Sequence, residues 1–179
     1  MANGRKVSAV DIKRLWYTDP MDNANDVALT YSALKEAIAK ATEIENVHQD
    51  TWQIEEGEPS QDFYKNQLTN STYRKGSKTM GDVTFAFTIG RYDFTTKAAL
   101  MGGTVSEDGK SWARQRGVTD VNKMLIALTE DDVYCVIPVA AISAREANTD
   151  GAIGIAVQGT MMEPSSKNVD PEYWFDGQE

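Results

Sequence analysis

The sequence predicts a mainly β protein, an antiparallel β-sandwich or rolled barrel with one flanking α-helix at about 29–45 and one short helix at about 94–101. Segments with the two-residue alternation of half-buried strands outnumber segments with a helical period. Short turns separate the last three of these segments, and this spacing is typical of an antiparallel meander. The one long amphipathic helix is expected on the flank of the sheet, because its apolar stripe needs a surface to cover.

The first strand is expected within residues 9–18, AVDIKRLWYT. Val10, Ile12 and Trp16 fall on one face of an extended chain there, with Arg14 as the exception. A turn-rich stretch, DPMDNAND, then separates this strand from the helix.

The long helix is expected in 29–44, LTYSALKEAIAKATEI. Thr30 or Ser32 can cap its first turn. Four apolar side chains recur at helical spacing and form one stripe: Tyr31, Leu34, Ile38 and Ala41.

A short strand in 51–56 precedes the clearest strand of the chain, DVTFAFTI in 82–89. Its predicted buried face alternates strictly with small and polar residues: Val83, Phe85, Phe87 and Ile89. The short helix follows, with Asp93 as its N-cap and Gly102-Gly103 as its stop.

The rest of the chain reads as a hairpin around Asp108-Gly109 and then the three strands of the meander. Those strands are expected at 123–129, 133–144 and 152–162. We expect one domain in 1–164 and an acidic C-terminal tail in 165–179, whose Tyr173-Trp174-Phe175 could dock onto a surface.

The stretch 57–82 is too long for an ordinary connection between two strands. It is mostly polar, yet it holds several aromatic side chains, and its second half is basic within an acidic protein. As a hairpin of about 11 residues per strand it would reach about 36 Å, well beyond a domain whose radius of gyration is about 15 Å. It therefore either projects to contact another molecule or folds back as an ordered surface loop.

Composition excludes several classes of protein. A net charge of −9 argues against a non-specific DNA-binding protein, and a single cysteine excludes an internal disulfide framework. No secretory segment is visible, and no apolar run approaches the roughly 18 residues of a membrane span. We therefore expect synthesis and folding in a cytoplasm, with no membrane partner.

Candidate chemistry is sparse. Cys135 and His48 are the only conceivable nucleophile and base, but Cys135 lies on an apolar strand face, where a free cysteine usually belongs to the core. Acidic clusters at 55–58 and 130–132 lack the ligand spacing of a calcium loop and are interpreted as solvated turns. No phosphate-binding, metal-binding or hydrolase motif occurs. We expect no catalytic residues, no metal and no cofactor.

The aromatic side chains leave one binding alternative open. The four tryptophans could line a glycan-binding groove on a β-sandwich, although packing explains most tryptophans in such folds. They are Trp16, Trp52, Trp112 and Trp174.

The order of these segments resembles the phage tail tube (major tail) protein family. The resemblance spans roughly 7–164: a strand WQIEEGEPS enters the long polar loop QDFYKNQLTNSTYRKGSKTMG, which returns as DVTFAFTIG, a short helix DFTTKAALMGG and a meander ending in GIAVQGTMMEP. Proteins of that family are β-sandwiches with a flanking helix that form hexameric rings, and the rings stack into a tube through which DNA passes. Contractile and non-contractile tails share this fold.

The resemblance implies a non-enzymatic virion protein whose partners are other copies of itself and possibly other tail proteins. In the family the loop corresponding to 57–82 contacts the next ring, and the terminal arms often cross to neighbours. This implies subunit contacts here for Phe63, Tyr64, Tyr73, Arg74 and Lys75. An acidic lumen that lets DNA slide without specific binding would fit the charge of −9. The alternatives are a β-sandwich module that binds a glycan or protein, and a small enzyme of unrecognised class.

Overall fold

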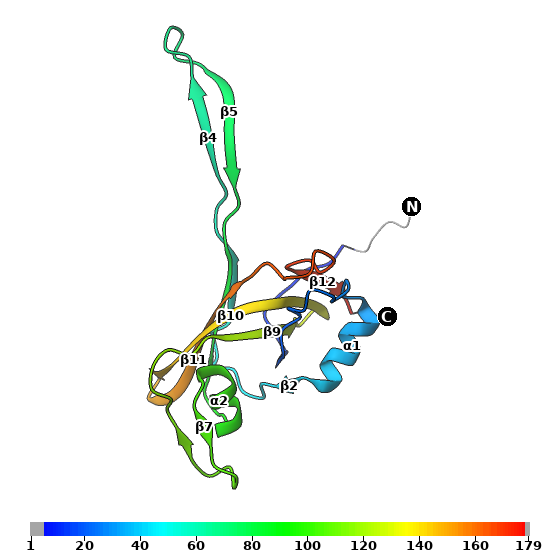
Figure 1. The fold of residues 1–179 in the computed structure, drawn as a ribbon, viewed down its shortest axis with the longest axis vertical. Helices are drawn as coiled ribbons and strands as arrows, with labels where there is room; N and C mark the ends of the chain where they lie inside the picture. The colour runs from blue at the N-terminus through cyan, green and yellow to red at the C-terminus, as the bar shows by residue number, and fades with distance from the viewer. Residues whose placement is uncertain (1–5, 178–179) are drawn as a thin grey trace.

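The computed structural model describes residues 6–177 and shows a mainly β protein built on one large antiparallel sheet with two helices (Figure 1). The sheet runs in the order β2-β1-β9-β10-β11-β6-β3, and β12 pairs with β10 beside this path. The strands are β1 (Arg14–Thr18), β2 (Thr42–Glu43), β3 (Gln53–Glu56), β6 (Val83–Ile89), β9 (Val121–Leu128), β10 (Val133–Thr149), β11 (Ala152–Met161) and β12 (Tyr173–Asp176). The predicted fold class is confirmed.

The sheet rolls because the long strand β10 is bent. Its first half pairs with β9 and β12, and its second half pairs mainly with β11. Between Ile137 and Ala140 the register gains one residue on β10, and Pro138, which has no N–H for the ladder, lies in this bulge. The two halves of the sheet therefore face each other across one apolar core, formed by Leu15, Tyr17, Leu125, Ala127, Cys135, Ile137, Phe85, Phe87, Ile89, Ile155 and Val157 among others.

The helix α1 (Tyr31–Lys40) covers the outer face of β1, β9 and β10, where a second apolar cluster includes Trp16, Leu34, Met124, Ile126 and Val136. The N–H of Ala33 donates to the Thr30 side chain at 3.2 Å, so Thr30 is the cap and Ser32 is not. The helix is shorter than the expected 29–45. It ends at Lys40 because the next residues leave in an extended conformation and pair with β1 as β2.

The first strand is also shorter than expected, and its predicted face is wrong. Val10 is exposed and lies before β1, and Asp11 has a positive φ of 46°, which breaks the extended chain. Ile12 packs against the inner core, whereas Trp16 belongs to the cluster under α1. Alternation across the break therefore does not continue from Val10 to Trp16.

The short helix α2 (Phe94–Met101) forms where the sequence predicts it. Asp93 accepts the N–H of Thr96 at 2.6 Å, and the helix ends at Gly102 with φ 74°. The next segment is a small hairpin, β7 (Thr104–Val105) with β8 (Trp112–Ala113), whose turn contains Gly109 at φ 68°.

The C-terminal segment is part of the sheet rather than a free tail. Tyr173–Asp176 pairs with Val133–Val136 as β12, and Tyr173 and Phe175 pack against the cluster under α1. The docking considered from the sequence is therefore onto the protein's own strand β10.

Candidate assembly interface

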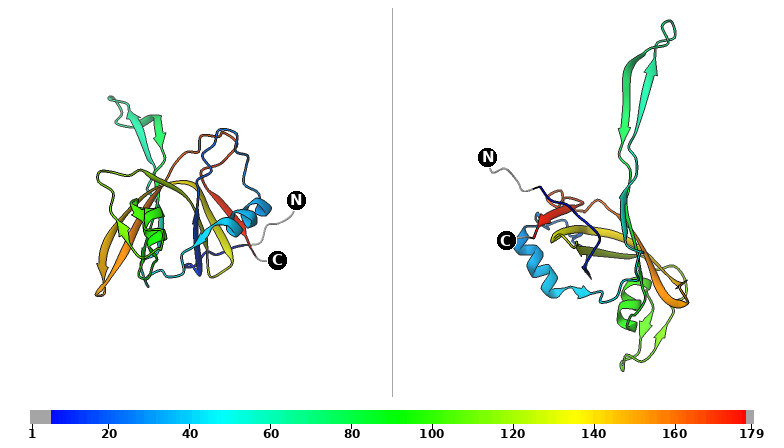
Figure 2. Two further views of the ribbon diagram at one scale, coloured as in Figure 1. Left: turned by 60° about the horizontal axis from the view of Figure 1, so that its bottom comes forward. Right: turned by 180° about the vertical axis from the view of Figure 1, so that it is seen from behind.

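The stretch 57–82, called the arm from here on, is a long two-stranded hairpin that stands away from the body (Figures 1 and 2). It contains β4 (Ser60–Lys65) and β5 (Thr72–Thr79), which pair with each other and, in residues 6–177, with no other strand. Of the two possibilities that the sequence leaves open, the structure has the projecting hairpin and not the folded-back loop.

Two glycines position the base of the arm. The Gly57 N–H donates to the Asp82 carbonyl at 2.9 Å, directly beyond the last pair of the β3–β6 ladder, Glu56 and Val83. A Cβ on Gly81 would lie 2.0 Å from the Gly57 carbonyl oxygen, so only glycine allows this approach. The arm thus continues two strands of the main sheet, and the paired glycines at 57 and 81 are the sequence signal that marks its base.

The tip of the arm is an ordered turn. The Asn66 N–H donates to the Ser71 carbonyl at 2.8 Å, the Asn70 N–H donates to the Asn66 carbonyl at 2.8 Å, and the Asn66 side chain accepts the Leu68 N–H at 2.9 Å. Leu68 at the apex is 94% exposed. Because it is an apolar side chain held at the end of an ordered hairpin, Leu68 is a contact candidate in addition to the five residues predicted from the sequence.

The five predicted contact residues all lie on the arm, and the register divides them between its two faces. Phe63 pairs with Lys75 on one face, whereas Tyr73 is the extra residue of β5 where the register shifts between Tyr64 and Lys65. Tyr64 pairs with Arg74 on the other face, where the guanidinium lies 5.5 Å from the ring centroid. Phe63, Tyr64 and Tyr73 are 55%, 50% and 67% exposed. Both faces of the arm therefore present aromatic and basic groups to the outside.

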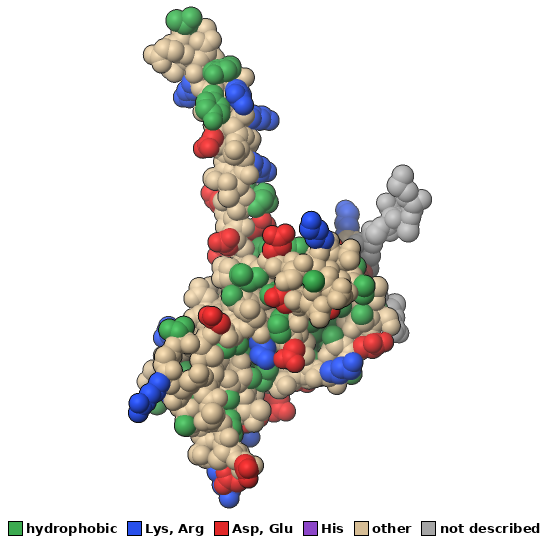
Figure 3. Space-filling view, viewed as in Figure 1, with side chains coloured by type: hydrophobic (Ala, Val, Ile, Leu, Met, Phe, Trp, Pro, Cys, Tyr) green, Lys and Arg blue, Asp and Glu red, His purple; other side chains and the backbone are tan. Residues whose placement is uncertain are grey.

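The arm and the body carry opposite charges. Between Ser60 and Thr79 four basic side chains outweigh the single Asp62 and give +3, so the rest of the chain, whose total is −9, carries −12. Within residues 6–177 no ion pair uses any of these four basic groups. Figure 3 shows basic and hydrophobic side chains along the outer part of the arm and acidic ones around its base.

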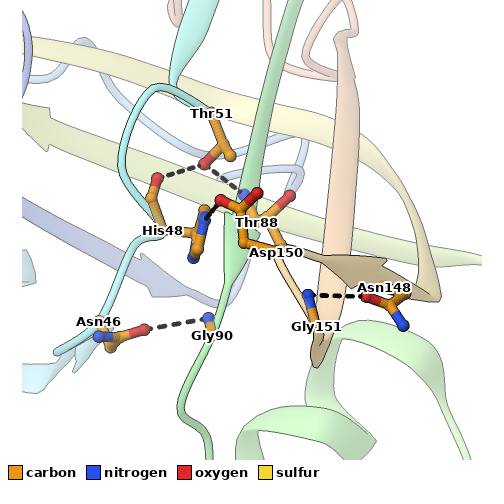
Figure 4. Close-up of polar contacts among 8 residues, drawn as sticks. All are labelled: Asn46, His48, Thr51, Thr88, Gly90, Asn148, Asp150 and Gly151. Carbon is orange, nitrogen blue, oxygen red and sulfur yellow. Dashed lines mark hydrogen bonds and ion pairs between the residues drawn. The ribbon is translucent and has the colours of Figure 1, made fainter.

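The candidate nucleophile and base do not meet. Cys135 is buried in the inner core, and this burial raises the pKa of its thiol to about 12. His48 instead approaches Asp150 in the β10–β11 turn, with 2.8 Å between Nε2 and Oδ2 (Figure 4). The Thr51 hydroxyl donates to the His48 carbonyl at 2.6 Å and accepts the Thr88 N–H at 3.0 Å. These bonds fasten the chain before β3 to the edge of β6.

The acidic turn at 130–132 has structural partners. Lys13 forms an ion pair with Asp132, and the Ser8 hydroxyl donates to Asp131 at 2.7 Å. Among the described residues no group of three or more His, Cys, Asp or Glu side chains is placed to hold a metal ion. No helix in the same part of the chain is long and apolar enough to cross a membrane.

The tryptophans do not gather into a groove. Trp16 is buried under α1, and Trp52 packs near Phe87 with 6.2 Å between ring centroids. Trp112 lies 4.3 Å from the Lys97 ammonium, and the half-exposed Trp174 donates to Glu172 at 2.6 Å. Their four separate positions give the glycan-binding alternative no common surface.

Comparison of the chain with protein-family profiles and with curated proteins gives no match.

Proposed function

We propose that the protein is a non-enzymatic structural subunit that assembles with copies of itself into the stacked rings of a phage tail tube. The observation that carries this proposal is the arm, whose aromatic and basic side chains are exposed and whose strands, among the described residues, pair only with each other. A hairpin that continues two core strands holds these groups in place at little entropic cost on binding. Aromatic and arginine side chains are also the types enriched in protein interfaces.

The shape of the subunit favours an open assembly over a closed pair. The arm leaves one end of the domain, and the opposite end, with α2 and β7, has a different structure (Figure 1). An arm that contacts a different surface on the next copy makes a head-to-tail interface, which repeats into a ring or a filament. Rings that repeat in this way along the arm form a stack.

The charge of the body supports passage of DNA through such a stack. The chain outside β4, β5 and their turn has a net charge of −12, so the domain repels a polyanion and does not retain it. One face of the β3-β6-β11 part of the sheet is also small and polar: Gln53, Ala86 and Gln158 pair in one row across it, and Glu55, Thr84 and Thr160 pair in the next. Such a face suits a lumen, and the site of action would be the virion tail.

Assembly of the purified protein at high concentration tests the proposal. We expect rings or tubes by negative-stain microscopy, and a sedimentable fraction that grows with concentration. Replacing 59–80 by Asn-Gly should leave a folded monomer that forms neither. Wild-type protein that stays monomeric at every concentration and salt condition would overturn the proposal.

Point variants sharpen this test. Phe63→Ser and Tyr73→Ser should each reduce the sedimentable fraction. Val118→Ser is the control, because Val118 is also an exposed hydrophobic side chain, 96% exposed, and lies outside the arm. Equal losses for all three variants would show that general surface hydrophobicity, not the arm, drives association.

A further inference from the structure

We infer that the arm of one copy docks into a hollow at the opposite end of the next copy, an inference that rests on the proposed self-assembly. This end hollow has a volume of about 580 Å³. It is lined by residues 42–46, Ile89, Arg91, Tyr92, Asp93 and Thr96.

The position of the end hollow follows from strand β6. The strand starts at the arm base with Val83 and ends at Ile89, which lines the hollow. Seven extended residues span about 23 Å, so the arm and the hollow lie at opposite ends of the same strand. Figure 2 shows the arm and the α2 end on opposite sides of the molecule. A second copy displaced along the arm therefore presents its hollow to the tip of the first.

The charge of the hollow complements the arm. Three carboxylates line it, Glu43, Glu45 and Asp93, against one cation, Arg91. Glu43 receives two 2.7 Å hydrogen bonds from Arg14, and these bonds hold the pKa of its carboxyl below the ordinary value. Glu45 is exposed and, within the described part of the chain, has no hydrogen bond or ion pair. It is therefore the carboxylate available to a cation from outside.

The hollow is already formed in the free subunit. The Asn46 side chain accepts the N–H groups of Gly90 and Arg91 at 3.0 and 2.9 Å, which joins its two walls (Figure 4 shows the bond to Gly90). Asp93 is fixed as the cap of α2. Because these bonds already hold the walls in place, little conformational entropy of the walls is lost when a side chain binds.

The arm offers the matching chemistry. Lys65, Arg74 and Lys75 lie in its outer half, next to the exposed rings of Tyr64 and Tyr73. The hollow combines its carboxylates with the ring of Tyr92 and the buried side chains of Ile44 and Ile89. An aromatic side chain accompanied by a cation fits such a lining, and opposite charges also guide the two surfaces together.

Charge reversal and its rescue test the inference. Glu45→Lys should raise the concentration needed for assembly about 10-fold at low salt, and the effect should shrink as salt screens it. Glu36→Lys, an equal charge change on the exposed face of α1, is the matched control and should change assembly by less than about 2-fold. Both variants should unfold at the wild-type temperature, since among the described residues neither carboxylate has a hydrogen-bond or ion-pair partner to lose.

The rescue identifies the arm residue. Lys65→Glu, Arg74→Glu and Lys75→Glu should each weaken assembly, and Glu45→Lys in the same chain should restore at least one of them. The docking site is wrong, while the proposed function stands, if the arm replacement abolishes assembly but Glu45→Lys and Glu36→Lys change the concentration needed for assembly equally. The same conclusion follows if Glu45→Lys rescues none of the three arm variants. If wild-type protein does not assemble at all, the proposed function itself fails.

Discussion

Replacing the arm by a tight turn should leave the domain at least as stable as the wild type. In this variant Asn-Gly replaces 59–80, so that Glu58 and Gly81 flank the turn. The flanking chains are already antiparallel and in contact there, with 2.9 Å between the Gly57 nitrogen and the Asp82 oxygen. Asn-Gly is the dipeptide that favours a two-residue hairpin turn.

The expected magnitude follows from chain entropy and burial. The connection between Gly57 and Asp82 shortens from 24 residues to four. Each halving of the loop length lowers the entropic cost of loop closure by about 0.6 kcal/mol, and this change amounts to between two and three halvings. Little is lost in return, because within the described residues β4 and β5 pair only with each other, and an isolated hairpin is itself of marginal stability. The free energy of unfolding should therefore rise by about 1.2–1.8 kcal/mol.

Urea denaturation followed by tryptophan fluorescence measures this change, because all four tryptophans remain in the variant. A control variant with only 66–71 replaced by Asn-Gly keeps most of the arm and should match the wild type within about 0.3 kcal/mol. A loss of more than about 1 kcal/mol on removal of the whole arm would refute the reasoning, since it would show that the arm supports the fold.

Three further predictions concern the body. Gly159→Ala places a Cβ about 2.0 Å from the buried ring of Phe85 and should lower the free energy of unfolding by about 1–3 kcal/mol. Adding Phe85→Leu should restore part of this loss, and unchanged thermal stability of Gly159→Ala would contradict this packing. Glu146→Gln removes the carboxylate 2.6 Å from the buried Lys97 ammonium and should cost about 1–2 kcal/mol at pH 7. The hydrogen bond from Lys97 lowers the pKa of Glu146 below 4.5, so the stability difference should be complete above pH 4.5 and decrease as pH falls through the lower folded-state pKa. A difference that does not decrease with falling pH in urea titrations would refute it. Cys135, with its thiol pKa raised to about 12 by burial, should resist a thiol reagent at pH 8 until the protein unfolds, and rapid labelling of the native protein would refute its place in the core.

Local patterns were sufficient for the elements whose structure depends on neighbouring residues. Val83, Phe85, Phe87 and Ile89 alternate with polar residues, and all four are buried on one side of β6. Asp93 caps α2 as predicted, because a cap bonds to an N–H only three residues away. The aromatic and basic candidates on the arm were also recognisable, since their excess over a polar background is visible without a structure.

By itself, the sequence determined the mainly β class, the meander, both helices and the position of the arm, because periodicity, capping and turn chemistry act within a few residues. Only the tertiary structure decided where α1 ends, which face Trp16 occupies and how Tyr173–Asp176 joins β10. It also decided that the arm projects from the body and that a hollow lies at the other end of β6. The helix end, the face of Trp16, the C-terminal pairing and the hollow depend on contacts between residues far apart in the chain, whose free energies outweigh the weak local preferences that sequence patterns reflect. The arm projects because β4 and β5 pair only with each other within the described residues.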